Sequence, residues 1–433
     1  GKLSDQVGRS SLFLIALGIF LIGSVVGGLA PTMGWLIVAR TVQGLGGGGL
    51  LILVQAIVAD VIPARERARY LSYVSAMFAL AAVLGPLVGG WLTEGPGWRW
   101  AFWINLPLGG AAMATAVLFL RRPAREPARL SIDVWGITTM TVGVTALVLI
   151  TSWGGTQFAW SSPVIGGLGL LALVSSVAFV LVERAVAEPI IPLHLFAERN
   201  FTVPTLAGLV TAVAMFGAVN YLPTYLQMVT GLSPVLSGLL LLALIAGLGL
   251  ATVGSAQVVS RTGRYKELPI TGCTLVAVAL GLLSTLAVDS SLWLIGSYLL
   301  LLGLGIGCVL QILVVIVQNT AASAEVGTAT AANNFFREIG VSLGTALVGT
   351  LFTFRLQAQL SERVTGGLDL NRLTPAGLEQ LPEAVRESVV LSYHEALTPV
   401  FLALVPLMVL SALGLAFVRP VPLATTTAGR SPE

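Results

Sequence analysis

The sequence has very little charge. Only 10% of its 433 residues are Asp, Glu, Lys or Arg, whereas 56% are hydrophobic, and the mean hydropathy is +0.92. A water-soluble chain of this length could not bury so much apolar surface, so we expect lipid to be its main solvent. The net charge is only +3 and no basic cluster lies on a polar face, which argues against a nucleic-acid partner.

The sequence is also poor in the residues that catalytic and metal sites use. It has two cysteines, Cys273 and Cys308, and two histidines, His194 and His394, and none of them has metal-ligand spacing. A membrane-embedded enzyme is therefore poorly supported, and we expect no metal and no cofactor. A cleavable signal peptide is not indicated either, because the apolar run 12–30 is too long for one.

Long uncharged runs are what the sequence has in abundance. Runs of about 20 residues each suit one membrane-spanning helix, and two longer runs divide at the polar breaks 154–157 and 231–234. Strands are disfavoured because the runs are long and lack alternation with a period of two. The pattern predicts an all-α integral membrane protein with twelve spans.

The positions of Lys and Arg predict the orientation in the membrane. These residues concentrate in alternate loops, and the intervening loops hold only Arg99, Arg355, Arg363, Arg372 and Arg386. Because basic loops stay on the cytoplasmic side, we expect the opening loop and the C-terminus to be cytoplasmic. The segment 355–395 is then an extracytoplasmic loop or a small amphipathic cap.

Three short motifs follow one another along the first hundred residues. Gly1-Lys-Leu-Ser-Asp5-Gln-Val-Gly8-Arg9 resembles motif A of the major facilitator superfamily, and Arg40-Thr-Val-Gln43-Gly44-Leu-Gly46 resembles its motif B. Gly85-Pro86-Leu-Val-Gly89-Gly90 resembles motif C, the antiporter motif. The segments 98–107, 222–227 and 333–340 are similar to segments of the fourteen-span drug:proton antiporter family, as is the extra pair of spans in 134–182.

This resemblance implies a major facilitator fold of two helical bundles with a central two-helix hairpin. Residues 1–122 would form the remainder of the N-terminal bundle, 123–200 the hairpin with its cytoplasmic linkers, 201–419 the C-terminal six-helix bundle and 420–433 a cytoplasmic tail. The loop 259–266 resembles the opening loop, since Gly263-Arg264 corresponds to Gly8-Arg9, although Ser260 stands in the place of Asp5. Two spans precede this second loop. By that symmetry we expect two further helices before Gly1, which would make fourteen spans.

Proton coupling is assigned to Arg40 and Gln43 by the resemblance to motif B. Arg40 is the only basic residue deep within a span, where an arginine costs on the order of 3 kcal/mol on insertion scales. The simpler alternative is that its side chain extends to the outer membrane surface. In the functional interpretation Arg40 faces the bundle interior and tunes the pKa of a carboxylate.

Two further sets of residues have both a structural and a functional interpretation. Gly1, Asp5, Gly8 and Arg9 would form a cytoplasmic latch, with Asp60, Arg65 and Arg67 as its partners, or else a solvated helix cap.

The second set is Gly85, Pro86, Gly89 and Gly90. These residues would make a bendable helix that seals the bundle interface against proton leak, or else only allow ordinary close packing. We expect Gly303, Gly305 and Gly307 to serve close helix packing.

The candidates for a substrate cavity are aromatic and amide side chains near the outer half of the second bundle: Phe216, Asn220, Tyr221, Tyr225, Gln227 and Gln311, with Gln55 as a weaker candidate. The alternative for the tyrosines is the usual enrichment of Tyr at the membrane interface.

Taken together, these features favour proton-coupled efflux of amphipathic drugs or toxic compounds across the cytoplasmic membrane. The expected partners are a lipophilic or cationic small molecule, protons and the lipid bilayer. The alternatives are export of an endogenous metabolite, such as an antibiotic, lipid or siderophore, and a non-transporting fragment.

Overall fold

The computed structural model describes residues 8–120, 133–155, 157–186, 189–322, 325–363, 375–378 and 381–423. Within these ranges the regular elements are helices, apart from one isolated bridge between Gly154 and Phe158. Eleven of the described helical segments are long and apolar enough to cross a membrane, and α4 (Ala64–Glu94) is a further long helix. The all-α membrane fold predicted from the uncharged runs is thereby confirmed.

The helices fall into three groups along the chain. The first group precedes residue 121 and consists of α2 (Arg9–Gly28), α3 (Met33–Val61), α4, α5 (Trp100–Trp103) and α6 (Asn105–Phe119). A hairpin follows, made of α7 (Val134–Trp153) and α8 (Pro163–Ala185), and a short 3-10 turn, η1 (Leu193–Ala197), leads out of it. The last group consists of α9 (Arg199–Val219), α10 (Leu222–Met228), α11 (Pro234–Thr262), α12 (Glu267–Ser284), α13 (Leu292–Thr320), α14 (Val326–Arg363), α15 (Pro375–Leu378) and α16 (Glu383–Ala416).

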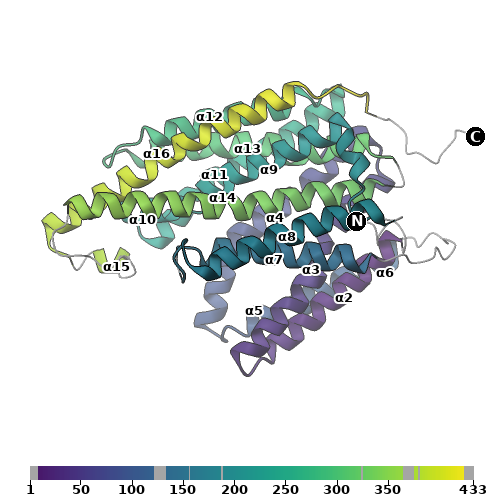
Figure 1. The fold of residues 1–433 in the computed structure, drawn as a ribbon, viewed down its shortest axis with the longest axis horizontal. Coiled ribbons are helices and arrows are strands. Elements are labelled where there is room, and N and C mark those ends of the chain that lie inside the picture. The colour runs from purple at the N-terminus through teal and green to yellow at the C-terminus, as the bar shows by residue number, and fades with distance from the viewer. Residues whose placement is uncertain are drawn as a thin grey trace, which may run out of the picture.

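The long helices run along the long axis of the molecule, and α2 begins at the same end at which α16 finishes (Figure 1). We call this the basic end, since Arg9 and Arg67 lie there, and the opposite end, with α5, α10 and α15, the distal end. Toward the distal end, α2 and α3 diverge from α9–α16, whereas the two groups meet at the basic end (Figure 1). The molecule therefore has two halves that are closest at the basic end.

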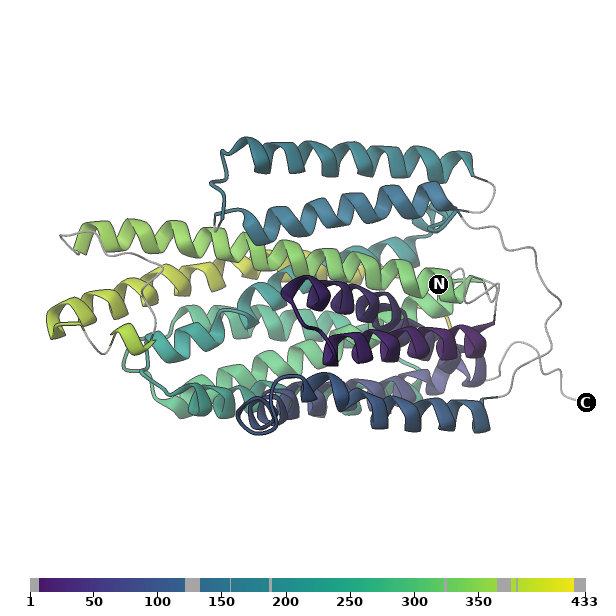
Figure 2. The ribbon, with the colours of Figure 1, turned by 90° about the horizontal axis from the view of Figure 1, so that it is seen from below.

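The hairpin of α7 and α8 lies outside both halves. Figure 2 shows it as a separate pair of helices alongside α14, with which α7 makes contact. Both hairpin helices are apolar and largely exposed, as expected for helices that face lipid on most sides.

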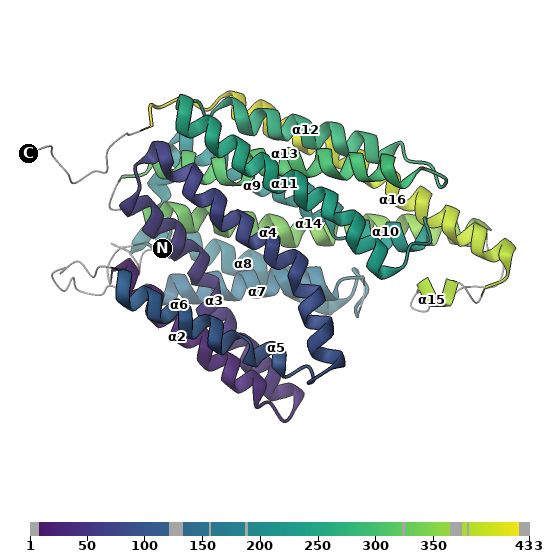
Figure 3. The same ribbon diagram turned by 180° about the vertical axis from the view of Figure 1, so that it is seen from behind.

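Two helices of the first group make the contacts between the halves. α4 packs against α11 and α13, which is visible from behind in Figure 3, and α3 contacts α14. Ala68 and Leu71 of α4 belong to the same buried apolar cluster as the core of the last group. α4 is thus anchored in the second half although it precedes the hairpin in sequence.

The single span expected over 202–228 is present as one candidate span, Arg199–Met228. Its helix is interrupted at Asn220 and Tyr221, between α9 and α10, because Pro223 lacks the N–H that a continuous helix would need. A predicted boundary differs from the structure further along the chain. The predicted loop 355–395 is helical at both ends, since α14 continues to Arg363 and α16 starts at Glu383.

This helical extension has a packing reason. Leu356 and Leu360 are one turn apart on α14 and are buried in the same cluster as Val389 of α16. The side chains of Arg363 and Glu395 then form an ion pair of 2.6 Å between the two helices. Charge alone indicated a loop here, whereas the spacing of the leucines favours a pair of helices that continues past the apolar runs.

Glycines let the helices of the second half approach closely. A Cβ atom added to Gly303 would lie 2.0 Å from the carbonyl oxygen of Leu244, and one added to Gly307 would lie 2.4 Å from that of Leu248, both on α11. Gly305 points instead toward α12, where its added Cβ would lie 2.8 Å from the carbonyl oxygen of Gly272. The predicted role of these three glycines in close packing is confirmed.

We predict that Gly303→Leu destabilises the fold by about 1–3 kcal/mol, because overpacking at this contact must separate α11 from α13. The thermal unfolding midpoint in detergent, followed by size-exclusion chromatography, measures the effect. Gly281→Leu on α12 is the matched control, since an added Cβ there meets no atom within 4 Å. Equal midpoints for the two variants would contradict the packing role.

Candidate functional site

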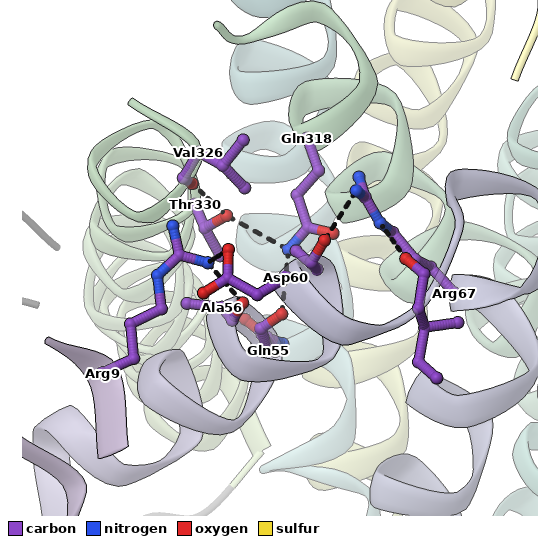
Figure 4. A network of polar contacts seen from close by, with 10 residues as sticks. Arg9, Gln55, Ala56, Asp60, Arg67, Gln318, Val326 and Thr330 are labelled. Atoms are coloured by element: carbon purple, nitrogen blue, oxygen red, sulfur yellow. Dashed lines mark hydrogen bonds and ion pairs between the residues drawn. The ribbon is translucent and has the colours of Figure 1, made fainter. Parts of the chain in front are cut away.

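Of the four residues predicted to form a cytoplasmic latch, the structure describes Gly8 and Arg9, and Arg9 is 8% exposed although charged. Its guanidinium forms an ion pair of 2.6 Å with Asp60 in the last turn of α3, and it donates a hydrogen bond to the carbonyl oxygen of Ala56 (Figure 4). Gly8 precedes the helix with φ of +94°, which glycine adopts easily. Gly1 and Asp5 lie outside the described residues, as does the side chain of Arg65.

Arg67 approaches the same helix end from α4. Its guanidinium donates to the carbonyl oxygens of Ala59, at 2.7 Å, and Ile62, at 3.1 Å. Burial lowers the pKa of Arg67, and the negative charge of Asp60 acts in the opposite direction. Two arginines therefore satisfy carbonyl groups at the C-terminus of α3, where the helix dipole favours positive charge.

The polar contact that joins the two halves lies one turn further into α3. The side-chain oxygen of Gln55 accepts a hydrogen bond of 2.8 Å from the amide of Asn334 on α14, and its backbone oxygen accepts one of 3.4 Å from Gln318 on α13. Gln318 also donates to Thr330, at 3.2 Å (Figure 4). We call Gln55, Gln318, Thr330 and Asn334 the amide clasp. Each of them is at most 4% exposed.

The amide clasp leaves part of its hydrogen-bonding capacity unused. Gln55 Nε2, Gln318 Oε1 and Asn334 Oδ1 are buried and have no hydrogen-bond partner among the described residues. An unsatisfied buried polar atom costs about 1–3 kcal/mol, which is as much as a hydrogen bond contributes or more. The clasp therefore specifies how the halves meet while adding little net stability.

The two residues predicted to couple protons lie in a polar network within the first half. Arg40 Nη1 donates to Gln43 Oε1 at 3.4 Å, and its guanidinium carbon lies 4.8 Å from the ring centre of Phe102. Gln43 donates to the hydroxyl of Ser24 at 2.8 Å, and Asn105 donates to that hydroxyl at 3.3 Å. The network ties α2, α3 and α6 together. Within the described residues no carboxylate forms an ion pair with Arg40, which is itself exposed.

The antiporter motif lies in the C-terminal third of α4. A Cβ atom added to Gly85 or Gly89 would meet no atom within 4 Å, so neither glycine makes a close helix contact among the described residues. Pro86 and Gly90 lie in the same helix, and their side-chain environments fall outside the described part of the structure. The close packing considered for this motif is therefore not observed at Gly85 and Gly89 in this conformation.

The candidate cavity residues contact different neighbours. Asn220 donates to Thr345 at 2.8 Å, the ring of Tyr221 lies 5.6 Å from that of Phe352, and the hydroxyl of Tyr225 lies 3.1 Å from Nδ1 of His394.

The remaining three candidates for the substrate cavity also lie in different surroundings. Phe216 packs against the core of the second half, Gln311 is half-buried on α13, and Gln227 lines a cavity of about 1020 Å³ at the distal end. The structure does not gather the six side chains around one cavity in this conformation.

Sequence reasoning missed most of the amide clasp. Gln55 was only a weak candidate for the cavity, and Gln318, Thr330 and Asn334 were not selected individually. One signal was present, because 333–340 is among the segments that carry the family resemblance. A buried amide at the end of an apolar run needs a partner, but the sequence does not reveal which helix supplies it.

Comparison with known proteins decides the family. The family model described as Major Facilitator Superfamily matches residues 1–134 and 134–345. The chain belongs to the major facilitator superfamily. An uncharacterized MFS-type transporter of Mycobacterium tuberculosis is 41% identical over 98% of this chain, which spans 62% of that relative's length. The multidrug transporter protein MdtP of Bacillus subtilis is 34% identical over 85% of this chain and 68% of the relative.

Solved structures of the superfamily share the fold. The human organic anion transporter MFSD10 aligns with a TM-score of 0.61 at 16% identity, covering 96% of this chain and 79% of that one. At this identity the match supports the arrangement of helices alone. The Arg9–Asp60 pair and the amide clasp thus lie in a major facilitator fold, at the end where its two halves meet.

We predict that Asn334→Leu raises the open fraction of the basic end about fivefold, because it removes a hydrogen bond contributing about 1 kcal/mol. Hydrogen–deuterium exchange of peptides covering 53–62 and 326–334 should increase. Asn319→Leu is the control, since Asn319 bonds the carbonyl oxygen of Val421 within the second half. Unchanged exchange in Asn334→Leu would rule out the clasp as a tie between the halves.

Proposed function

We propose that this protein exports amphipathic small molecules across the cell membrane by alternating access, with protons entering in exchange. The observation that carries the proposal is the pairing of the halves at one end only. Buried amide contacts join the halves at the basic end, while the helices diverge toward the distal end. In transporters built from two bundles, substrate passes when one bundle rocks against the other.

The positive-inside rule assigns sides to the two ends. Arg9, Arg67 and the last turn of α16 lie at the basic end, so this end is assigned to the cytoplasm. The described conformation then corresponds to an outward-facing state, in which the amide clasp joins the halves on the cytoplasmic side. An exporter would release its substrate from this state.

Two lines of support favour a drug-like substrate. The relative MdtP is named a multidrug transporter, and the second half contains aromatic and amide side chains at its distal end. Aromatic rings and amides accommodate varied apolar and cationic molecules because they offer both apolar area and polarity. The candidates Phe216, Asn220, Tyr221, Tyr225, Gln227 and Gln311 would approach the substrate in other conformations of the cycle.

Arg40 is proposed to take part in proton coupling through its positive charge. An exposed arginine within a span favours ionisation of a nearby carboxylate, and the carboxylate loses its proton when the two approach. An added Cβ at Gly44, Gly48 or Gly85 meets no atom of the described residues within 4 Å, so these faces of α3 and α4 leave room for a group that approaches Arg40.

We predict that Arg40→Ala in the full-length protein abolishes proton-driven efflux while insertion in the membrane remains normal. The measurement is efflux of a fluorescent lipophilic cation from vesicles with an imposed pH gradient. Arg40→Lys should retain part of the activity, because it keeps the charge but loses the contact geometry with Gln43. Full efflux in Arg40→Ala at normal expression would refute the coupling role.

The antiporter motif is proposed to limit proton leak. Because an added Cβ at Gly89 meets no atom within 4 Å, we predict that Gly89→Leu folds normally but exports less and leaks protons faster. A pH-sensitive dye in proteoliposomes measures the leak after an imposed gradient, with Gly254→Leu on α11, which also has space, as the control. Reduced export with an unchanged leak would leave packing or substrate binding as the role of the motif.

A further inference from the structure

A cleft of about 450 Å³ lies between the hairpin and α14, apart from the contact between the halves. Its walls come from α7, α8, the linker around η1 and α14. They include Met140, Phe179, Phe196, Phe335 and Phe336. This volume lies within the range of about 300–1,000 Å³ that small-molecule sites occupy.

The lining of the cleft offers no free hydrogen-bonding side chain. Its two hydroxyl residues bond to their own helices: Thr139 donates to the carbonyl oxygen of Trp135 at 2.8 Å, and Ser176 donates to that of Ala172 at 2.7 Å. The other lining residues are apolar. A polar or charged ligand group would lose its hydration here without compensation, so the chemistry fits hydrocarbon.

The position of the cleft indicates that its apolar ligand comes from the bilayer. α7 and α8 are 20 and 23 residues long, which suits a bilayer, and only 17% and 11% of their apolar windows are buried within the protein. The remaining surface of both helices faces acyl chains. The cleft lies between these lipid-exposed helices and α14, so lipid chains have direct access to it.

We propose that this cleft, the hairpin cleft, binds one acyl chain of a bilayer phospholipid. The chain fills the space that side chains leave between the hairpin and α14, and it contacts Phe335 and Phe336. These two residues directly follow Asn334, which forms the amide clasp with Gln55 on a different face of α14. The bound chain therefore supports the helix that closes the basic end.

The test is retention of phospholipid by the purified full chain. The protein is stripped of loosely bound lipid in detergent and analysed by native mass spectrometry after addition of phosphatidylglycerol. Thr139→Trp places an indole in the cleft, and Ser176→Phe fills it from the opposite wall. Thr138→Trp is the matched control, because Thr138 also bonds its own helix, at 2.8 Å to Val134, but does not line the cleft.

We expect the parent and Thr138→Trp to retain one phospholipid per chain, and both cleft variants to retain at least tenfold less while remaining monodisperse. Equal retention in all four proteins would overturn the proposal. So would retention of added tetraphenylphosphonium in place of the lipid, which would make the cleft a substrate site. A parent dimer without lipid that dissociates in Thr139→Trp would show that a second copy covers the cleft.

This binding assay does not depend on transport. A protein that retains the lipid but exports nothing would support the hairpin cleft and refute the proposed function. A protein that exports the cation but retains no lipid would support the proposed function and refute lipid binding in the hairpin cleft.

Discussion

The contact between the last turns of α3 and the helices α13 and α14 is the interaction on which the arrangement of the halves depends. Gln55 and Ala56 are neighbours in sequence, yet Gln55 bonds across to Asn334 and Gln318, whereas the carbonyl of Ala56 accepts from Arg9 of α2. Separation of the halves at this end must break the bonds of Gln55. It need not break the Arg9–Asp60 pair, which lies within the first half.

The energetics of this contact suit reversible closure. Hydrogen bonds between buried amides contribute about 1 kcal/mol each, and the unsatisfied atoms of the same side chains cost a similar amount or more. The apolar contact of α4 with α11 and α13 supplies a separate, less directional attraction. We infer that burial of α4 keeps the halves together, whereas the amides determine at which end they close.

Because lipid is the solvent, helices pack closely only where small residues allow it, and this explains why the second half is closely packed whereas part of α4 is not. Apolar side chains gain little by leaving lipid for protein, so close packing relies on small residues such as Gly303 and Gly307. A Cβ atom added to Gly85 or Gly89 on α4, in contrast, would meet no atom of the described residues within 4 Å. The helices of the second half are therefore closely packed through these glycines, whereas the face of α3 near Arg40 has space for another polar or apolar group.

Much of the fold could be predicted from the sequence, because charge and hydropathy act locally. The uncharged runs located the spans, and the alternation of basic loops predicted both chain ends on one side. The Arg9–Asp60 contact also followed from the motif and its expected partner.

The parts that were missed depend on the tertiary arrangement. Gln55 meets Asn334 across 279 residues of sequence, and no local pattern specifies such a pair. Leu356 and Leu360 lie in a segment whose charges indicate a loop or a small amphipathic cap, whereas their helical spacing continues α14 to Arg363. Hydropathy predicts the span 199–228 as a whole, but it does not reveal the break in the helix before Pro223.

The most direct test is a pair of spin-label distances in the full-length protein, with Cys273 and Cys308 replaced by Ala. Labels at Val61 and Ala322 report on the basic end, and labels at Leu29 and Trp293 on the distal end, since all four side chains are exposed. Alternating access predicts that a pH gradient or a transported cation lengthens the first distance while it shortens the second. Two distances that stay fixed, or that lengthen together, would contradict closure at one end as the basis of transport.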